Sequence, residues 1–331
     1  MHTARVPLPG HQLTHPRALA AGNDPGLRTR VRSTHLGGEV MSTLFRTAAA
    51  CAVLAGTVLL APAAAAAPVY HEYVALGDSW AADATLSNIS TQHAPLGCAQ
   101  SAGNYPKQVA AALGVAVFRD ATCGSATTVH MSAPQRLPVS INAPQFDRLT
   151  PTTDLVTLGI GGNDAGLADA VTGCLTTDPA VSPCQTTWVP DGVDAMSANI
   201  RAAEPVVIAV LNGIKARAPH ARILLLDYFK GVGDRGCFAS IPISDTDTAW
   251  IAHKLIELNA MLARAAAATG VELVNTYATS DGHDGCQAPG TRWAEGVIPL
   301  SHNPPGPAVP FHPNQLGADH QARSVLAALG T

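Results

Sequence analysis

The sequence predicts an α/β fold, a three-layer α/β/α sandwich around a central, mostly parallel sheet. From residue 73 onward, short apolar runs alternate with longer stretches of helical periodicity. This alternation is typical of parallel strands covered by helices on both faces. The Ile-Leu-Leu-Leu run at 223–226 is apolar at every position, as in a strand buried on both faces. No internal repeat or interdomain linker is visible, so we expect residues 68–331 to form one domain.

The expected elements follow one another in a regular order. The strands are expected at residues 73–76, 115–118, 154–160, 222–228 and 271–277. The helices are expected at residues 105–113, 145–149, 194–218, 248–269 and 313–329. Gly114, Pro219 and Gly270 stand directly after helical stretches, where glycine and proline stop a helix.

Three long stretches do not fit the sheet pattern, namely residues 172–190, 231–246 and 280–310. They are rich in Pro, Gly and Asp, and each contains cysteine. Long loops in a compact domain are usually functional or disordered. We therefore expect disulfide-held loops that form the walls of a substrate site.

Three polar side chains stand where the expected strands end or the last helix begins. Ser79 closes a Gly-Asp-Ser turn after the first strand, at the edge where open α/β sheets bind ligands. Alone, this tripeptide also suits a simple turn that ends a strand. Asn163, in a Gly-Gly-Asn-Asp turn, and His312, before Pro-Asn, supply an oxyanion donor and a base to the Ser79 nucleophile.

Other residues near these motifs have simpler interpretations. His283 and His302 compete with His312 for the role of base, but they stand in Gly/Pro-rich loops. Asp78 and Asp164 flank the proposed catalytic residues, and we expect their carboxylates to accept backbone N–H bonds in tight turns.

The three motifs in this order resemble the SGNH (GDSL-type) hydrolase family, close to secreted actinomycete esterases and lipases. The resemblance runs from about residue 73 to the C-terminus, and segments 98–106 and 123–127 are similar to the secreted subgroup. It implies an SGNH, flavodoxin-like fold and a secreted, monomeric carboxylic ester hydrolase. It also implies an acyl-enzyme on Ser79 and a base at His312, with no metal or cofactor.

The resemblance leaves two details of the site open. The first two oxyanion donors are expected to be the Asn163 side-chain N–H and the Ser79 backbone N–H. The family's third donor is a backbone N–H in a Cys-Ser-Gly-Ala-Thr segment, whereas this chain has Gly124 and Ser125 in reversed order. Both residues remain candidates, and we favour Gly124. Many members also carry Asp three residues before the histidine, where this chain has Val309. We therefore expect a Ser79–His312 dyad with a carbonyl of Val309 or Pro310 on the imidazole.

The cysteines predict a disulfide framework. Cys51 lies in an apolar N-terminal segment, and six cysteines remain, at 98, 123, 174, 184, 237 and 286. An even number in an exported chain favours disulfides over buried thiols, and the absence of a Cys-x-x-Cys spacing argues against zinc. The resemblance implies the sequential pairing Cys98–Cys123, Cys174–Cys184 and Cys237–Cys286.

Residues 41–67 resemble a signal peptide. Arg46 precedes an Ala/Val/Leu-rich core, and small residues precede a cleavage point near Ala66 or Ala67. The alternative is a membrane anchor, for which the uncharged stretch is long enough only with its Ala-rich end. After cleavage we expect no stable membrane anchor.

Residues 1–40 are expected to be a non-native upstream extension, because they show no apolar periodicity and precede a complete signal peptide. Translation is then expected to start at Met41. A twin-arginine extension is the alternative, but the arginines at 28, 30 and 32 are not adjacent.

The composition excludes some functions and leaves others open. Charged residues are 13% of the chain, the formal net charge is −4, and no basic block suggests nucleic-acid binding. The expected partner is a small-molecule or lipid ester substrate. A carbohydrate O-acetylesterase or a phospholipase of the same fold is the alternative enzyme. A disulfide-stapled binding module without turnover is the alternative from another class.

Overall fold

The fold is seen in a computed structural model that describes residues 69–299 and 308–331, all within a compact unit from Ala63 to Thr331. The expected extension at 1–40 and the expected signal peptide at 41–67 lie outside the described residues, as does His302. Among the helices that the structure describes, none combines the length and the apolar character that a bilayer crossing requires.

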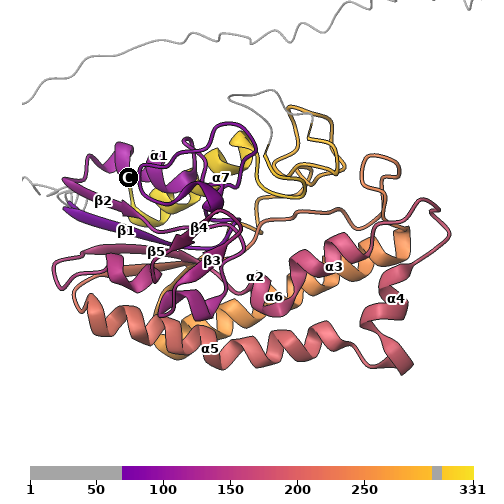
Figure 1. The fold of residues 1–331 in the computed structure, drawn as a ribbon, viewed down its shortest axis with the longest axis horizontal. Coiled ribbons are helices and arrows are strands. Elements are labelled where there is room, and N and C mark those ends of the chain that lie inside the picture. The colour runs from indigo at the N-terminus through magenta and orange to yellow at the C-terminus, as the bar shows by residue number, and fades with distance from the viewer. Residues whose placement is uncertain (1–68, 300–307) are drawn as a thin grey trace, which may run out of the picture. The chain divides into compact units, whose positions relative to one another are not determined.

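The centre of this unit is a five-stranded parallel sheet in the order β2-β1-β5-β6-β7. The strands are β1 (Glu72–Gly77), β2 (Val117–Asp120), β5 (Leu155–Gly159), β6 (Arg222–Leu226) and β7 (Glu272–Val274). The main helices are α1 (Tyr105–Leu113), α5 (Ala195–Arg217), α6 (Asp245–Thr269) and α7 (Gln315–Leu329). Figure 1 shows α1 and α7 on one side of the sheet and α5 and α6 on the other. The predicted three-layer fold is confirmed.

Alternate residues of the central strands β1, β5 and β6 pack into two separate apolar cores. Val74 and Leu76 of β1 belong to the core formed with α5 and α6. Tyr73 and Ala75 belong to the core formed with α1 and α7. Because both faces are covered, the central strands β1, β5 and β6 carry near-continuous apolar runs, and this is why they were visible in the sequence.

Helix boundaries follow capping residues. Asn104 caps α1 through Lys107 N–H, and Gly114 ends the helix with a φ of 62°. Ser244 caps α6 through Asp247 N–H. Asn314, two residues after His312, caps α7 by accepting from Leu316 and Gly317 N–H, which fixes the start of that helix at Gln315.

Some strands differ in extent from the expectation. β2 begins two residues later than predicted and extends to Asp120, in register with Glu72 to Ala75 of β1. β7 ends at Val274 rather than at residue 277. The reason is that the Asp227 carboxylate accepts the N–H groups of Thr276 and Tyr277, which a neighbouring strand would otherwise bind.

Several short elements were not predicted. They are the hairpin of β3 (Gln135–Leu137) and β4 (Ser140–Asn142), and the helices α2 (Gly162–Ala165), α3 (Leu167–Gly173) and α4 (Pro183–Trp188). Single 3₁₀ turns occur at η1 (Leu96–Cys98), η2 (Thr128–Met131), η3 (Gln145–Arg148) and η4 (Pro190–Gly192). The helix expected at 145–149 is the η3 turn.

Three disulfides join segments outside the sheet: Cys98–Cys123, Cys174–Cys184 and Cys237–Cys286. This is the pairing that the family resemblance implies. Two of the bridges tie down the three long stretches identified in the sequence, and the first joins the η1 region to the segment after β2.

Candidate active site

The candidate site lies where parallel strands end at their carboxyl edge. Ser79 follows β1, and Asn163 lies in α2 just after β5. The ends of these two strands approach closely because Gly77 has no side chain. A Cβ on Gly77 would lie 2.5 Å from the carbonyl oxygen of Gly159. Open parallel sheets bind ligands at this edge, since loops there leave a crevice.

Ser79 and His312 are in hydrogen-bond contact across 233 positions of sequence. His312 Nε2 lies 2.8 Å from Ser79 Oγ, and His312 Nδ1 lies 2.9 Å from the carbonyl oxygen of Pro310. A carbonyl can only accept, so Nδ1 carries the ring hydrogen. The lone pair of Nε2 therefore faces the serine hydroxyl, which is the arrangement that a general base requires.

The turn that carries His312 is held by backbone geometry and by a buried polar group. Phe311 has a φ of 63°, a left-handed conformation that is uncommon for a bulky residue. Glu295 N–H donates to the His312 carbonyl at 3.0 Å. The Glu295 carboxylate itself pairs with Arg292 and accepts from Asn314 at 3.0 Å. This carboxylate therefore supports the turn and does not bind the imidazole.

The environment keeps the imidazole neutral. Burial lowers the pKa of His312 below its ordinary value of 6.5, and the hydrogen bond to Pro310 acts in the opposite direction. Desolvation disfavours the imidazolium because a charge loses its hydration on burial. A neutral His312 at pH 7 is able to accept a proton.

One of the two side-chain amide hydrogens of Asn163 is already in a hydrogen bond, and the other has no protein acceptor among the described residues. Its Nδ2 donates to the carbonyl oxygen of Ala126 at 2.8 Å, and the side chain lines the same cavity as Ser79 and His312. A primary amide has two N–H donors. The second is available for an oxyanion in the cavity.

The geometry favours Ser125 over Gly124 as the third donor, which reverses the preference drawn from the sequence. Gly124 N–H donates to the Cys98 carbonyl at 2.9 Å and is therefore occupied. A Cβ on Gly124 would also lie 2.9 Å from the same oxygen. Ser125 has a φ of 62°. Within residues 69–299 and 308–331, neither Ser125 N–H nor Ser79 N–H donates to a protein acceptor.

The two flanking aspartates hold turns together, as expected. Asp164 accepts from Thr128 N–H at 3.1 Å, which ties the segment after Cys123 to α2. Asp78 accepts from Trp80 N–H at 2.9 Å and from the Tyr228 hydroxyl at 2.5 Å. Burial raises the pKa of Asp78 to about 6, and these hydrogen bonds oppose the rise.

Tyr228 is a site residue that the sequence reasoning missed. It lies two residues after the end of β6, lines the cavity, and is buried. Its place after a parallel strand is the same signal that identified Ser79 and Asn163. The strand expected at 222–228 included Tyr228 itself, so the residue received no role in the site.

A cavity of about 430 Å³ opens beside Ser79. All three long stretches contribute to its walls, as predicted, and α3 and α6 contribute further apolar side chains. The apolar lining comprises Leu167, Ala168, Val171, Leu175, Val232, Ile251, Leu255, Val297, Val309, Pro310 and Phe311. Such a cavity accommodates an apolar chain next to the nucleophile.

His283, the other described candidate for a base, lies elsewhere. Its ring stacks on Trp293 at a centroid distance of 3.9 Å, and Nδ1 lies 2.7 Å from the carbonyl oxygen of Thr291. It makes no contact with Ser79.

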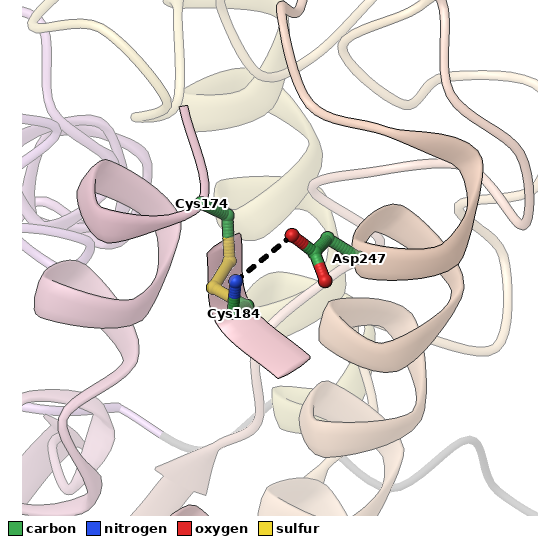
Figure 2. Close-up of side chains that lie close together, drawn as sticks. All are labelled: Cys174, Cys184 and Asp247. Atoms are coloured by element: carbon green, nitrogen blue, oxygen red, sulfur yellow. Dashed lines mark hydrogen bonds between the residues drawn. A yellow bond between two sulfur atoms is a disulfide. The ribbon is translucent and has the colours of Figure 1, made fainter. Parts of the chain in front are cut away.

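Cys174, Cys184 and Asp247 form a group with the spacing of metal ligands (Figure 2). The two sulfurs are joined in a disulfide, and Asp247 accepts from Cys184 N–H at 3.0 Å. Thiolates are needed to bind zinc through cysteine. The group therefore anchors α4 to the first turn of α6.

Comparisons with known proteins agree with this geometry. Residues 75–320 match the model of the GDSL-like Lipase/Acylhydrolase family. The chain is 38% identical over 267 residues to Lipase 2 of Streptomyces coelicolor, covering 78% of this chain and 86% of that protein. It is 29% identical over 275 residues to a lipase of Streptomyces rimosus, covering 82% of this chain and 91% of that protein.

Solved structures give the same result. The extracellular lipase of Streptomyces rimosus superposes with a TM-score of 0.58 at 27% identity, over 78% of this chain and 99% of that one. Phospholipase A1 of Streptomyces albidoflavus superposes with a TM-score of 0.57 at 25% identity, over the same 78% and 99%. The chain therefore belongs to the GDSL-like lipase/acylhydrolase family and is an ester hydrolase.

Proposed function

We propose that this chain is an exported serine esterase in which Ser79 is the nucleophile and His312 the general base. The observation that carries the proposal is the 2.8 Å contact between Ser79 Oγ and His312 Nε2 beside an apolar cavity. A serine hydroxyl becomes a competent nucleophile only when a base removes its proton.

The reaction follows from these contacts. Ser79 Oγ attacks the ester carbonyl carbon while its proton passes to His312 Nε2. The tetrahedral intermediate collapses, and His312 returns the proton to the departing alkoxide, so the alcohol leaves and an acyl-serine remains. Water then attacks the acyl carbon and gives a proton to His312. That proton returns to Ser79 Oγ as the carboxylic acid departs.

The developing oxyanion is held by preorganised donors. The Ser79 and Ser125 backbone N–H groups and the second amide hydrogen of Asn163 are the three candidates. Loss of one side-chain donor of this kind costs on the order of 10²–10³ in kcat. No metal or cofactor has a role in these steps.

The cavity supports an apolar acyl chain rather than acetate. An acetyl group would leave most of the volume of about 430 Å³ unfilled, whereas a longer chain would bury its surface against α3 and α6. The proposed substrate class is therefore a lipid or other fatty acyl ester.

Two assays test the proposal. Nitrophenyl esters from acetate to palmitate, together with phospholipid and acetylated xylan, are compared on the wild-type protein and on Ser79→Ala. We expect the variant to lose on the order of 10³–10⁶ in turnover. A fluorophosphonate is expected to label the Ser79 peptide of the wild type in a mass spectrum. Near-normal turnover by Ser79→Ala, or a label on another residue, contradicts the mechanism.

Export is proposed on separate grounds. The similar lipase of Streptomyces rimosus is extracellular, and residues 41–67 have the pattern of a signal peptide. N-terminal sequencing of protein from culture medium is expected to begin just after Ala66 or Ala67. An intact segment 41–67 on the cell-associated protein would instead indicate an anchor.

A further inference from the structure

We propose that Tyr228 is a positioning residue whose phenol aligns the turn bearing Ser79 with the turn bearing Asn163. This inference rests on the proposed function, because it assumes that Asn163 stabilises the oxyanion. Tyr228 does not touch the reacting atoms in this account.

The phenol lies between the two turns. Tyr228 Oη donates to Asp78 Oδ2 at 2.5 Å and accepts from Gly162 N–H at 2.9 Å. The directions are fixed, since an amide N–H only donates and an ionised carboxylate only accepts. Asp78 immediately precedes Ser79, and Gly162 immediately precedes Asn163. One hydroxyl group thus links the neighbours of the nucleophile and of the oxyanion donor.

Tyr228 is itself firmly held. Its backbone N–H donates to Asn259 Oδ1 at 3.0 Å, and its carbonyl accepts from Asn259 Nδ2 at 2.8 Å. Its ring meets Trp80 edge-on at a centroid distance of 5.7 Å. The ring is therefore fixed by α6 on one side and by the Ser79 turn on the other.

The phenol packs closely on the backbone of Gly162. A Cβ on Gly162 would lie 3.0 Å from Tyr228 Oη, so a side chain there would push the phenol away from the N–H. Burial raises the pKa of Tyr228 well above its ordinary value of 10.0, which keeps the hydroxyl able to donate. Without it, Asp78 Oδ2 and Gly162 N–H would both lose a partner in a buried place.

A second buried tyrosine provides a matched control. Tyr73 is fully buried in the other core, and its hydroxyl bonds Thr157 Oγ1 at 2.7 Å, away from the cavity. Tyr73→Phe also removes a buried phenol hydroxyl. The kcat of Tyr73→Phe therefore shows how much turnover changes when a buried phenol hydroxyl is lost away from the site.

The test compares Tyr228→Phe with Tyr73→Phe on a short nitrophenyl ester. We expect Tyr228→Phe to lower kcat by about 10- to 100-fold, with KM nearly unchanged, because displacement of a catalytic group by a fraction of an ångström has effects of that size. Tyr73→Phe is expected to keep wild-type kcat. Fluorophosphonate titration to the endpoint counts the competent sites, so that unfolded protein does not lower the apparent kcat.

A double-mutant cycle separates this inference from the proposed function. If Tyr228 acts through Asn163, Tyr228→Phe costs little further kcat in an Asn163→Ala background. Full additivity, or wild-type kcat in Tyr228→Phe, overturns the positioning role while leaving Ser79 and His312 in place. Wild-type kcat in Asn163→Ala would instead overturn the proposed oxyanion donor and, with it, the premise of this inference.

Discussion

The imidazole of His312 takes its orientation from a peptide carbonyl and not from a carboxylate. The Pro310 oxygen fixes the tautomer at 2.9 Å but brings no negative charge. Burial then lowers the pKa of His312, since the hydrogen bond to the Pro310 carbonyl acts in the opposite direction but does not fully compensate the desolvated imidazolium. The base therefore takes up a proton at a lower pH than an ordinary imidazole does.

The pH dependence of activity follows from this environment. A neutral imidazole is needed for proton transfer, so activity is lost as the pH falls through the pKa of His312. That pKa lies below 6.5, and we expect kcat/KM to persist below that pH. Asp78 titrates nearby, with a pKa of about 6. NMR titration of the His312 ring in Ser79→Ala therefore checks the assignment, and a ring pKa above 6.5 would contradict it.

Val309→Asp places a carboxylate at the position that many family members use. The added charge favours the imidazolium, so the pKa of His312 rises and the acid limb of kcat/KM moves to higher pH. Val309→Asn has a similar shape without the charge and is the control. If both variants shift the limb equally, the effect is steric and not electrostatic.

The reversed Gly124-Ser125 pair predicts opposite responses to substitution. Gly124→Ala forces a Cβ to within 2.9 Å of the Cys98 carbonyl, so we expect clear destabilisation. Ser125→Gly relieves a φ of 62°, and we expect the free energy of unfolding to stay level or rise by up to about 1 kcal/mol. Activity persists in Ser125→Gly because the N–H is retained. Denaturant unfolding measures the stability of each variant, and ester hydrolysis measures its activity. Equal loss of stability in Gly124→Ala and Ser125→Gly would refute this account.

At the residue scale, the sequence predicted which side chains stand at strand ends. It did not predict which backbone N–H, that of Gly124 or of Ser125, is left without a protein acceptor in the described part of the chain. Ser79, Asn163 and His312 line one cavity, as their positions after strands and before the last helix suggested. The choice between Gly124 and Ser125 depends on a hydrogen bond to Cys98, which is distant in sequence. Local pattern carries no information about such a contact.

At the scale of elements, α3 forms one wall of the cavity, and we expect this wall to limit the length of acyl chain that fits. Val171 is partly buried on the cavity side, whereas Asp169 on the same helix is exposed and outside the lining. We expect Val171→Trp to lower kcat/KM for dodecanoyl esters relative to acetyl esters by about tenfold or more. Asp169→Trp is the control and leaves the ratio unchanged. An unchanged ratio in Val171→Trp would show that the acyl chain lies elsewhere.

The elements that escaped prediction share a physical reason. The β3–β4 hairpin has only three residues in each strand and exposes Val139 and Ile141. Helices α2, α3 and α4 are short. Gly166 separates α2 from α3, and Pro183 is the first residue of α4. The hairpin packs on η1, α2 packs on α5, and α3 and α4 pack on α6. These elements depend on contacts with distant segments, so they show little periodicity of their own.

At the scale of the whole molecule, the three bridges hold the loops and not the sheet. Among the described residues, the core formed with α1 and α7 contains no cysteine, whereas the Cys98–Cys123 bridge lies in the core formed with α5 and α6 and ties its loop segments together. We expect protein lacking residues 1–67 to show no free thiol when denatured without reductant. Reduction should lower the melting temperature, since each bridge contributes about 2–4 kcal/mol. Thiol titration and calorimetry check this, and two or more reactive thiols in the unreduced protein would contradict the framework.

The overall architecture was predictable because a parallel sheet buried on both faces imposes strand patterns that survive in a single sequence. The extent of β7 was not, because the Asp227 carboxylate takes over the N–H groups that would have extended it. A side chain that substitutes for a strand partner looks like any other aspartate in the sequence.

The backbone contact at His312 has a consequence for how this turn tolerates change. Every amino acid at position 310 supplies a carbonyl oxygen, so the identity of that side chain matters less than the path of the chain. The left-handed residue at 311 directs that path, and Glu295 N–H holds its far end. We therefore expect substitutions at position 310 to preserve activity as long as the turn keeps its shape. Deletion of one residue from the turn would move the carbonyl oxygen away from the His312 ring. This part of the site is encoded in spacing more than in composition.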